Sequence, residues 1–397
     1  MKFNAFRSLQ FAWRTATRAI LLPVFILTLL PMVHAGAAPE KLQAGTASVE
    51  RLGSVFVDGA GPMIEARAGD WRLSNENVSL TFVSVDTTPT TISQPIAGWL
   101  QRHHPEYRVP GALIDISVDG DIIDFLGNFT QSVGLGLEDP LIIYDVAEPV
   151  QKGQEVGLRL ESSPFEANPV RMETTYWLAG GRYNVRIETR FLDASADRPM
   201  PQIVDAGNWG RASAFLPGRG FLAFNAVKAL RTPGLMVHGA DMSLGLVPRG
   251  ATSVEGNFSG RPSRGRLMTF PTAYAGSAED KDDTTAPTMP SVKETAVDMT
   301  QTLVRDLWLG RGHIDSVSNH IYSSPAESFA TYTGRVLDKA TGEPITDTRV
   351  EVLELEPVQR RPRAFLMTIA GVDDQGRYRV NLPEGSYYLK PLTGSTR

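Results

Sequence analysis

The stretches TGRVLDKATGEPI (333–345) and DDQGRYRVNLPEGSYYL (373–389) decide the fold of the C-terminal part of this chain. Within RYRVNL, the apolar Tyr378, Val380 and Leu382 alternate with polar residues, which is the period-2 pattern of a half-buried strand. Polar turns that contain a glycine separate such runs, at Gly342, Gly376 and Gly385. We therefore predict a small antiparallel β-sandwich over residues 329–395, and nothing in it is arranged as a catalyst.

The preceding part of the chain also has the pattern of β structure. The 397 residues include 36 glycines and 27 prolines and show few long helical patterns, which favours many turns over helices. Strand-like runs recur at 54–57, 70–85, 113–126, 141–146, 156–161, 170–178, 183–192 and 243–247. We predict an all-β fold, with a large β-sandwich over residues 40–325 and a flexible polar loop at 276–300.

The N-terminus has the pattern of a secretory signal peptide. Lys2, Arg7, Arg14 and Arg18 precede an apolar run at 19–33, and small residues follow up to Ala35. The apolar run is too short for a spanning helix, which needs about 20 residues. We expect residues 1–35 to be removed and no stable membrane span to remain. Because no cysteine follows the run, a lipoprotein anchor is excluded.

The absence of cysteine, beside an export signal, indicates a bacterial protein whose core holds the fold without disulfides. We expect a periplasmic or secreted protein of a Gram-negative bacterium. The net charge of −5 and the scattered Lys and Arg residues provide no basic field for nucleic acid. Nucleic acid is therefore excluded as a partner.

A β-hairpin is the strongest local prediction, and it is centred on Asp119-Gly120. These two residues lie between alternating runs and favour a type I′ turn, in which both central residues have positive φ. The turn sets the register so that Asp115 opposes Asp124. One face of the hairpin is then expected to lie in the core, with Ile114, Ile116, Val118, Ile123 and Phe125.

Two opposed carboxylates repel each other, so Asp115 and Asp124 need a neutralising group. A cation or a shared proton would make them a cation site or an acid–base pair. An Arg from a neighbouring strand, or solvent, would make them structural. The segment lacks the spacing of a calcium loop.

Two further segments are rich in polar and aromatic residues. The run QRHHPEYR (101–108), with His104, is either a surface loop or a site for an anion or a sugar. The run DAGNWGR (205–211) is bracketed by glycines, and loops of this kind bind sugars by stacking and hydrogen bonding. Its ligand-binding candidates are Asp205, Asn208, Trp209 and Arg211. The alternative is a core position for Trp209.

No metal or cofactor site is expected. His238, His313 and His320 are isolated in the sequence, and neither HxH nor HExxH occurs. Without cysteine a thiol nucleophile is impossible, and GxSxG and phosphate-loop motifs are also missing.

The C-terminal module resembles the carboxypeptidase regulatory-like domain, a prealbumin-like or Ig-like sandwich that is typically an accessory to another domain. Before it, GDWRLSNENVSLTF (69–82), PGALIDISVDGDIIDFLG (110–127) and LGRGHIDSV (309–317) follow one another. This order is similar to the exported N-terminal half of bacterial CehA/McbA-type metallohydrolases. The resemblance implies a catalytic PHP domain downstream, which begins with HxH. We expect no such domain within these 397 residues, so no catalytic residue is carried over.

These observations favour a non-catalytic exported module. It would bind a polysaccharide or cell-envelope component, with Trp99, Tyr107 or Trp209 lining a groove, or serve as the scaffold of a downstream metal-dependent hydrolase. An alternative is a carbohydrate-active enzyme on a mutarotase-like super-sandwich. Its acid–base candidates are Asp115, Asp124, His104 and Asp205. A third alternative is a purely structural envelope protein.

Overall fold

The computed structural model describes most of the chain beyond the N-terminal segment. The described residues are 41–53, 66–87, 108–120, 126, 128–133, 142–164, 171–192, 203–208, 212–216, 220–221, 227–232, 234–239, 242–249, 254–260, 266–272, 302–323, 328–356 and 363–393. The predicted signal peptide, the 276–300 loop and the 54–57 strand lie outside them.

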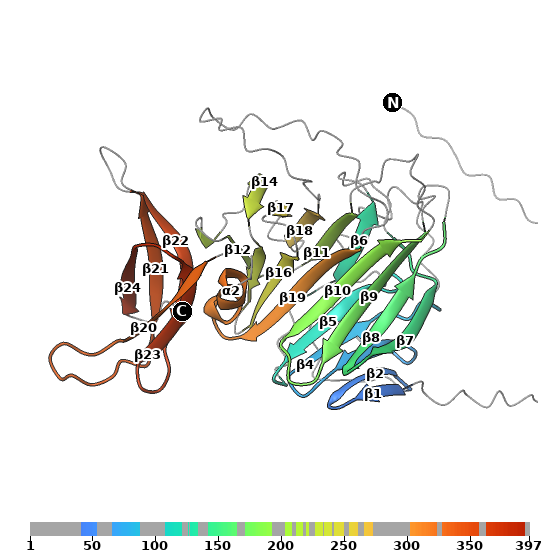
Figure 1. The fold of residues 1–397 in the computed structure, drawn as a ribbon, viewed down its shortest axis with the longest axis horizontal. Coiled ribbons are helices and arrows are strands. Elements are labelled where there is room, and N and C mark those ends of the chain that lie inside the picture. The colour runs from blue at the N-terminus through green and yellow to red at the C-terminus, as the bar shows by residue number, and fades with distance from the viewer. Residues whose placement is uncertain are drawn as a thin grey trace, which may run out of the picture. The chain divides into compact units, whose positions relative to one another are not determined.

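One layer of the large sandwich is a ten-stranded sheet with the order β1-β2-β3-β4-β5-β6-β11-β18-β17-β14 (Figure 1). Its strands are β1 (Lys41–Ala44), β2 (Ala47–Arg51), β3 (Trp71–Ser74), β4 (Val78–Phe82), β5 (Leu113–Val118), β6 (Asn128–Val133), β11 (Ile203–Asn208), β14 (Val227–Thr232), β17 (Val254–Gly260) and β18 (Arg266–Thr272). The neighbouring strands pair antiparallel.

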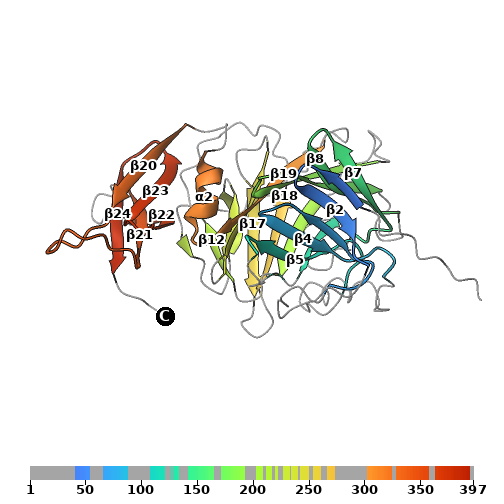
Figure 2. The same cartoon turned by 90° about the horizontal axis from the view of Figure 1, so that it is seen from below.

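The other layer is a nine-stranded sheet with the order β13-β12-β15-β16-β19-β10-β9-β8-β7 (Figure 1). Figure 2 shows the same fold turned by 90°. Its strands are β7 (Val146–Lys152), β8 (Glu155–Glu161), β9 (Met172–Ala179), β10 (Asn184–Phe191), β12 (Ser213–Leu216), β13 (Gly220–Phe221), β15 (Leu235–His238), β16 (Met242–Pro248) and β19 (Leu303–Arg311). These strands also pair antiparallel.

A single apolar core fills the space between the two sheets. Alternate residues of both sheets are buried in it, such as Leu73 and Leu80 from one layer and Leu158 and Leu244 from the other. The rings of Phe82 and Tyr176 meet across the layers, with centroids 4.7 Å apart. The prediction of an all-β sandwich is therefore confirmed.

The predicted hairpin turn has the backbone expected of it. Asp119 and Gly120 have φ angles of 51° and 72°, which is the left-handed region that a type I′ turn requires. Ile116 and Val118 are buried in the main core. Ile114 is also buried, but it packs in a separate cluster, so the predicted common face is wrong for this residue. A register shift between β4 and β5 interrupts the alternation there.

Two predicted strands differ from the observed ones. The run at 70–85 forms two strands, β3 and β4, because the Asn75 side chain accepts the backbone N–H groups of Asn77 and Val78 and turns the chain. The predicted strand at 141–146 is wrong, since the chain becomes a strand only at Val146.

The small sandwich consists of a two-stranded sheet, β20-β23, and a three-stranded sheet, β22-β21-β24. Its strands are β20 (Phe329–Arg335), β21 (Thr348–Glu356), β22 (Arg363–Gly371), β23 (Arg377–Pro383) and β24 (Tyr387–Thr393). Val380 and Leu382 are buried, whereas Arg377 and Arg379 are exposed, as the alternation in RYRVNL predicts.

A short helix that the sequence reasoning did not predict, α2 (Asp315–Tyr322), follows β19. Asp315 begins it, and its carboxylate accepts the backbone N–H of Gly371 on β22 at 3.2 Å. Burial raises the pKa of Asp315 to about 6, against a smaller opposite effect of its backbone hydrogen bonds. Within the described part of the chain, no helix is long and apolar enough to cross a bilayer.

We expect Asp315 to make the protein less stable as the pH rises. Its folded-state pKa is raised, so between pH 3.8 and about 6 the folded state keeps a proton that the unfolded state has lost. Relative to Asp315→Asn, the free energy of unfolding of the wild type should fall through this window and level off above it. Urea unfolding across the window measures the difference. Parallel pH profiles of the two proteins would contradict the expectation.

Candidate functional site

Asp205 does not lie in an exposed ligand-binding loop. Residues 203–208 form β11, which is inside the ten-stranded sheet between β6 and β18. The prediction of a loop is therefore wrong for Asp205 and for Asn208, the last residue of the strand. Trp209 and Arg211 lie outside the described residues.

The Asp205 side chain takes part in a buried polar network between the two sheets. Its Oδ1 accepts hydrogen bonds from Gln131 Nε2 at 2.8 Å and from Arg305 Nη2 at 2.7 Å. Arg305 comes from β19 of the opposite sheet and also donates to Thr189 Oγ1 at 2.9 Å. Asp205 is 0% exposed, and so is Arg305. The pair therefore links the two layers of the large sandwich.

The network continues through Gln131 to Tyr144 and Thr174. Gln131 Oε1 accepts hydrogen bonds from the Tyr144 hydroxyl and, at 2.8 Å, from Thr174 Oγ1. Burial raises the pKa of Tyr144, so its phenol stays neutral and donates. Within the described part of the chain, the Oδ2 atom of Asp205 has no hydrogen-bond partner. A carboxylate enclosed in this way is structural and cannot contact an external ligand or act as an acid–base group on a substrate.

The predicted carboxylate pair is only half within the described residues. Asp115 lies on β5 opposite Thr81 of β4 and is partly exposed. Asp124 lies outside the described residues, as do Trp99, His104 and Tyr107. Arg108, the described end of the 101–108 run, is buried in an ion pair with Asp70. This end of the run therefore has a structural role.

Histidines that are isolated in the sequence come together in the fold. The rings of His238, at the end of β15, and His313, just after β19, have centroids 6.0 Å apart. His238 Nδ1 lies 2.9 Å from Ser243 Oγ. Nevertheless, no three His, Asp or Glu side chains of the described residues converge on a point where a metal ion could bind.

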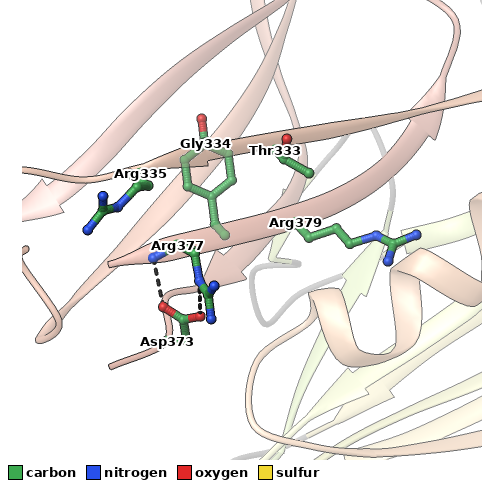
Figure 3. Close-up of a pocket in the computed structure, with 7 residues that line it drawn as sticks. Thr333, Gly334, Arg335, Asp373, Arg377 and Arg379 are labelled. Atoms are coloured by element: carbon green, nitrogen blue, oxygen red, sulfur yellow. Dashed lines mark hydrogen bonds and ion pairs between the residues drawn. The ribbon is translucent and has the colours of Figure 1, made fainter. Parts of the chain in front are cut away.

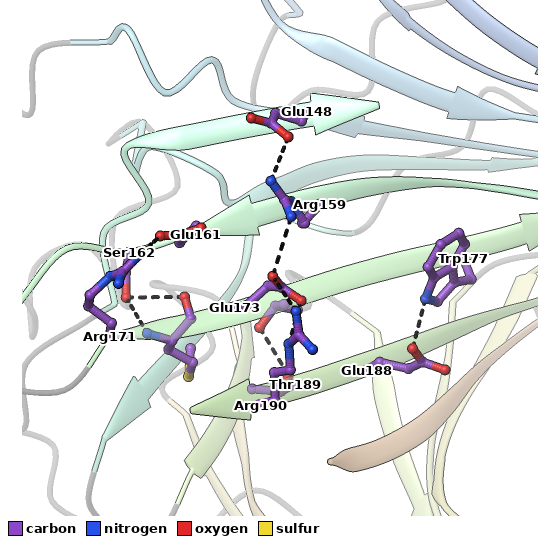
Figure 4. A network of polar contacts seen from close by, with 12 residues as sticks. Glu148, Arg159, Glu161, Ser162, Arg171, Glu173, Trp177, Glu188, Thr189 and Arg190 are labelled. Atoms are coloured by element: carbon purple, nitrogen blue, oxygen red, sulfur yellow. Dashed lines mark hydrogen bonds and ion pairs between the residues drawn. The ribbon is translucent and has the colours of Figure 1, made fainter. Parts of the chain in front are cut away.

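The outer face of the nine-stranded sheet carries a ladder of ion pairs across β7, β8, β9 and β10 (Figure 4). Arg159 lies 2.6 Å from Glu148 and 3.7 Å from Glu173, and Glu173 also pairs with Arg190 at 2.7 Å. Glu188 pairs with Arg186 of the same strand at 3.0 Å and accepts the indole N–H of Trp177 on β9 at 2.9 Å. Each of these carboxylates thus contacts at least one guanidinium group. Opposite charges on neighbouring strands stabilise a sheet. The ladder is a neutralised surface.

The small sandwich has a different kind of surface, a shallow hollow of about 430 Å³ on the sheet of β20 and β23 (Figure 3). It is lined by Thr333, Gly334, Arg335, Asp373, Arg377, Tyr378 and Arg379. In the sequence, Arg377 and Arg379 stand out only as polar residues of an alternating strand. Arg335 joins them because β20 pairs with β23, a contact between segments about 40 residues apart for which the sequence carries no local signal.

The hollow contains more positive than negative charge. Arg335 and Arg377 lie directly opposite each other in the register, an arrangement of like charges that destabilises a sheet. Of the described residues that line the hollow, Asp373 alone is acidic, and its Oδ2 pairs with Arg377 Nε at 2.7 Å. The backbone N–H of Arg377, and then its guanidinium, lower the pKa of Asp373. Its carboxylate is therefore already occupied.

Arg335 and Arg379 are less engaged than Arg377. Arg335 Nε donates to the backbone carbonyl of Gln375 at 3.2 Å, and no carboxylate of the described residues forms an ion pair with Arg335. The exposed Arg379 side chain has no ion-pair partner among the described residues. Figure 3 shows that it extends away from the guanidinium groups of the other two arginines. The face thus presents separated cationic groups.

Comparisons with known proteins yield only distant similarity. No family model and no curated protein matches the chain. Among solved structures, the α-N-acetylgalactosaminidase NagBb of Bifidobacterium bifidum matches 72% of this chain and 38% of its own, with 9% identity and a TM-score of 0.37. The GH36 α-galactosidase AgaA of Geobacillus stearothermophilus matches over 72% and 43%, with 9% identity and a TM-score of 0.35. The chain thus spans less than half the length of these two proteins, and such scores do not establish a shared fold.

We expect a single substitution in the buried Asp205–Arg305 pair to lower the free energy of unfolding more than substitution of both residues. Arg305→Met leaves the Asp205 carboxylate buried without its cation, which should cost about 3–5 kcal/mol of unfolding free energy. Adding Asp205→Val removes the uncompensated charge, so the double variant should be more stable than Arg305→Met alone. Urea unfolding monitored by circular dichroism measures both values.

The control is Lys41→Met on β1, since Lys41 pairs with Glu50 of β2 at 3.3 Å and the two side chains are 52% and 31% exposed. Loss of this pair should cost less than about 1 kcal/mol. An Arg305→Met protein as stable as the control would show that the buried pair does not hold the two sheets together.

Proposed function

We propose that this chain is a non-catalytic, exported binding module whose small sandwich contacts an anionic polysaccharide or another polyanion of the cell envelope. The observation that carries the proposal is the net positive charge of the hollow, where Arg335 opposes Arg377, Arg379 also lines the surface and, among the described residues, Asp373 alone supplies a negative charge. A sheet that places like charges opposite each other is less stable on its own. A bound anion would remove that repulsion.

The spacing of the guanidinium groups favours a polymer over a single small anion. The three arginine side chains do not converge on one point, and Arg379 extends away from the others (Figure 3). Guanidinium groups bind carboxylates and phosphates through charge-assisted, often bidentate hydrogen bonds. Separated groups on an open, shallow surface can each take one anionic group of a chain with repeated charges.

Binding fits the described residues better than catalysis. Asp205, an acid–base candidate of the enzyme alternative, is enclosed between the sheets. The carboxylates of the outer ladder face guanidinium groups or an indole N–H. The resemblance to the N-terminal half of exported metallohydrolases supports a compatible proposal, in which the module presents a polymeric substrate to a downstream hydrolase domain.

The test is affinity electrophoresis of the full chain through gels that contain polygalacturonate or neutral dextran. We expect retardation only by polygalacturonate, and we expect it to weaken with added salt because exposed charges are screened over about 8 Å at physiological ionic strength. The chain has a net charge of −5, so its overall field opposes binding to a polyanion and retardation would report a local site.

Substitutions locate the site. Arg379→Gln should weaken binding about tenfold, the worth of one charge-assisted hydrogen bond. Arg349→Gln is the matched control, because Arg349 is an exposed arginine on β21 that does not line the hollow. Equal retardation by dextran, or equal binding by the two variants, would overturn the proposal.

A further inference from the structure

Helix α2 packs one of its faces directly on the backbone of the large sandwich. Val317 and Ile321 are buried in a cluster with Met236, from the nine-stranded sheet. Gly245 on β16 makes this close approach possible, because a Cβ at that position would lie 2.3 Å from Val317 Cγ1. Such a contact leaves the helix little freedom to move on the sheet.

A neighbouring face of α2 is bound to β22 of the small sandwich. Ser318 Oγ and Thr368 Oγ1 are 2.6 Å apart, and both residues are 0% exposed. The Tyr322 hydroxyl donates to the Met367 carbonyl at 3.0 Å, and the Tyr322 side chain belongs to the core of the small sandwich. Separation of the two sandwiches would break these hydrogen bonds and expose the apolar part of the Tyr322 side chain to water.

A third set of contacts joins α2 to β23, the strand that carries two arginines of the hollow. Asn319 Oδ1 accepts the backbone N–H of Asn381 at 2.7 Å, and Asn319 Nδ2 donates to the Arg379 carbonyl at 3.4 Å. The Asn381 side chain returns a hydrogen bond to the Asn319 carbonyl at 3.2 Å. The helix therefore holds the backbone of the binding strand.

We infer that α2 docks the small sandwich onto the large one, so that the arginine hollow is held at a set position and not carried on a mobile tether. The described residues of both sandwiches belong to one compact unit. Domains within a chain usually move relative to each other unless a large apolar interface joins them. Here the helix makes an apolar contact on one side and a set of hydrogen bonds on the other. The inference goes beyond the proposed function and holds whether or not the hollow binds a polyanion.

Spin-label distance measurements on the full chain test the docking. The sequence has no cysteine, so Lys152→Cys on the large sandwich and Lys339→Cys on the small one give a single labelled pair at exposed positions. We expect one narrow distance distribution in this background. A broad distribution would show a tether and overturn the inference.

Removal of the hydrogen bonds from α2 to β22 and β23 should let the two sandwiches move relative to each other, while the apolar core of each sandwich stays intact. Combining Ser318→Ala, Asn319→Ala and Tyr322→Phe deletes the hydroxyl bonds to β22 and the Asn319 side-chain bonds to β23, and the narrow distribution should be lost. Lys390→Gln, on β24 at the edge of the three-stranded sheet away from β22, should keep it. A distribution that stays narrow in the triple variant would show that these contacts of α2 do not dock the small sandwich. Circular dichroism of each variant confirms that both sandwiches remain folded, so a broad distribution cannot be ascribed to unfolding.

Discussion

The large sandwich depends on one buried ion pair, between Asp205 and Arg305, that joins its two sheets. Neither charge reaches water, so each must be neutralised by the other at a fixed position. A slip of β11 or β19 by one residue would turn one partner to the other face and leave the remaining charge buried alone. Apolar contacts tolerate small rearrangements far better. Hydrophobic burial therefore stabilises the sandwich, while this pair specifies how the two sheets face each other.

The same pair explains where sequence reasoning fails. Residues 205–208 are Asp, Ala, Gly and Asn, most of which favour turns over strands, so a loop is the natural prediction. The strand forms because β6 and β18 pair with it on both sides and because Arg305, a hundred residues away, neutralises Asp205. Where local pattern and tertiary burial agree, as at Val380 and Leu382 or at the Asp119-Gly120 turn, the sequence predicts the structure well.

For a related reason, the sequence pattern predicts neither the arginine hollow nor helix α2. Arg335 and Arg377 become neighbours only through the β20–β23 pairing, and α2 has eight residues, too few for a clear helical period. Each feature is created by contacts between distant segments. Local periodicity predicts that residues are exposed or buried, but it does not predict which exposed charges will share a face.

The two sandwiches differ in how far their charged side chains are neutralised. On the large one, the outer ladder pairs each guanidinium with a carboxylate, and the interior pair is sealed from water. On the small one, β23 presents Arg377 and Arg379 beside Arg335 with a single acid between them. Strand β23 is also the strand whose backbone α2 holds through Asn319. Because the surplus charge lies on a strand that is fixed to a neutralised scaffold, a ligand bound there would meet the large sandwich in one orientation, which is the geometry that presentation of a polymer requires.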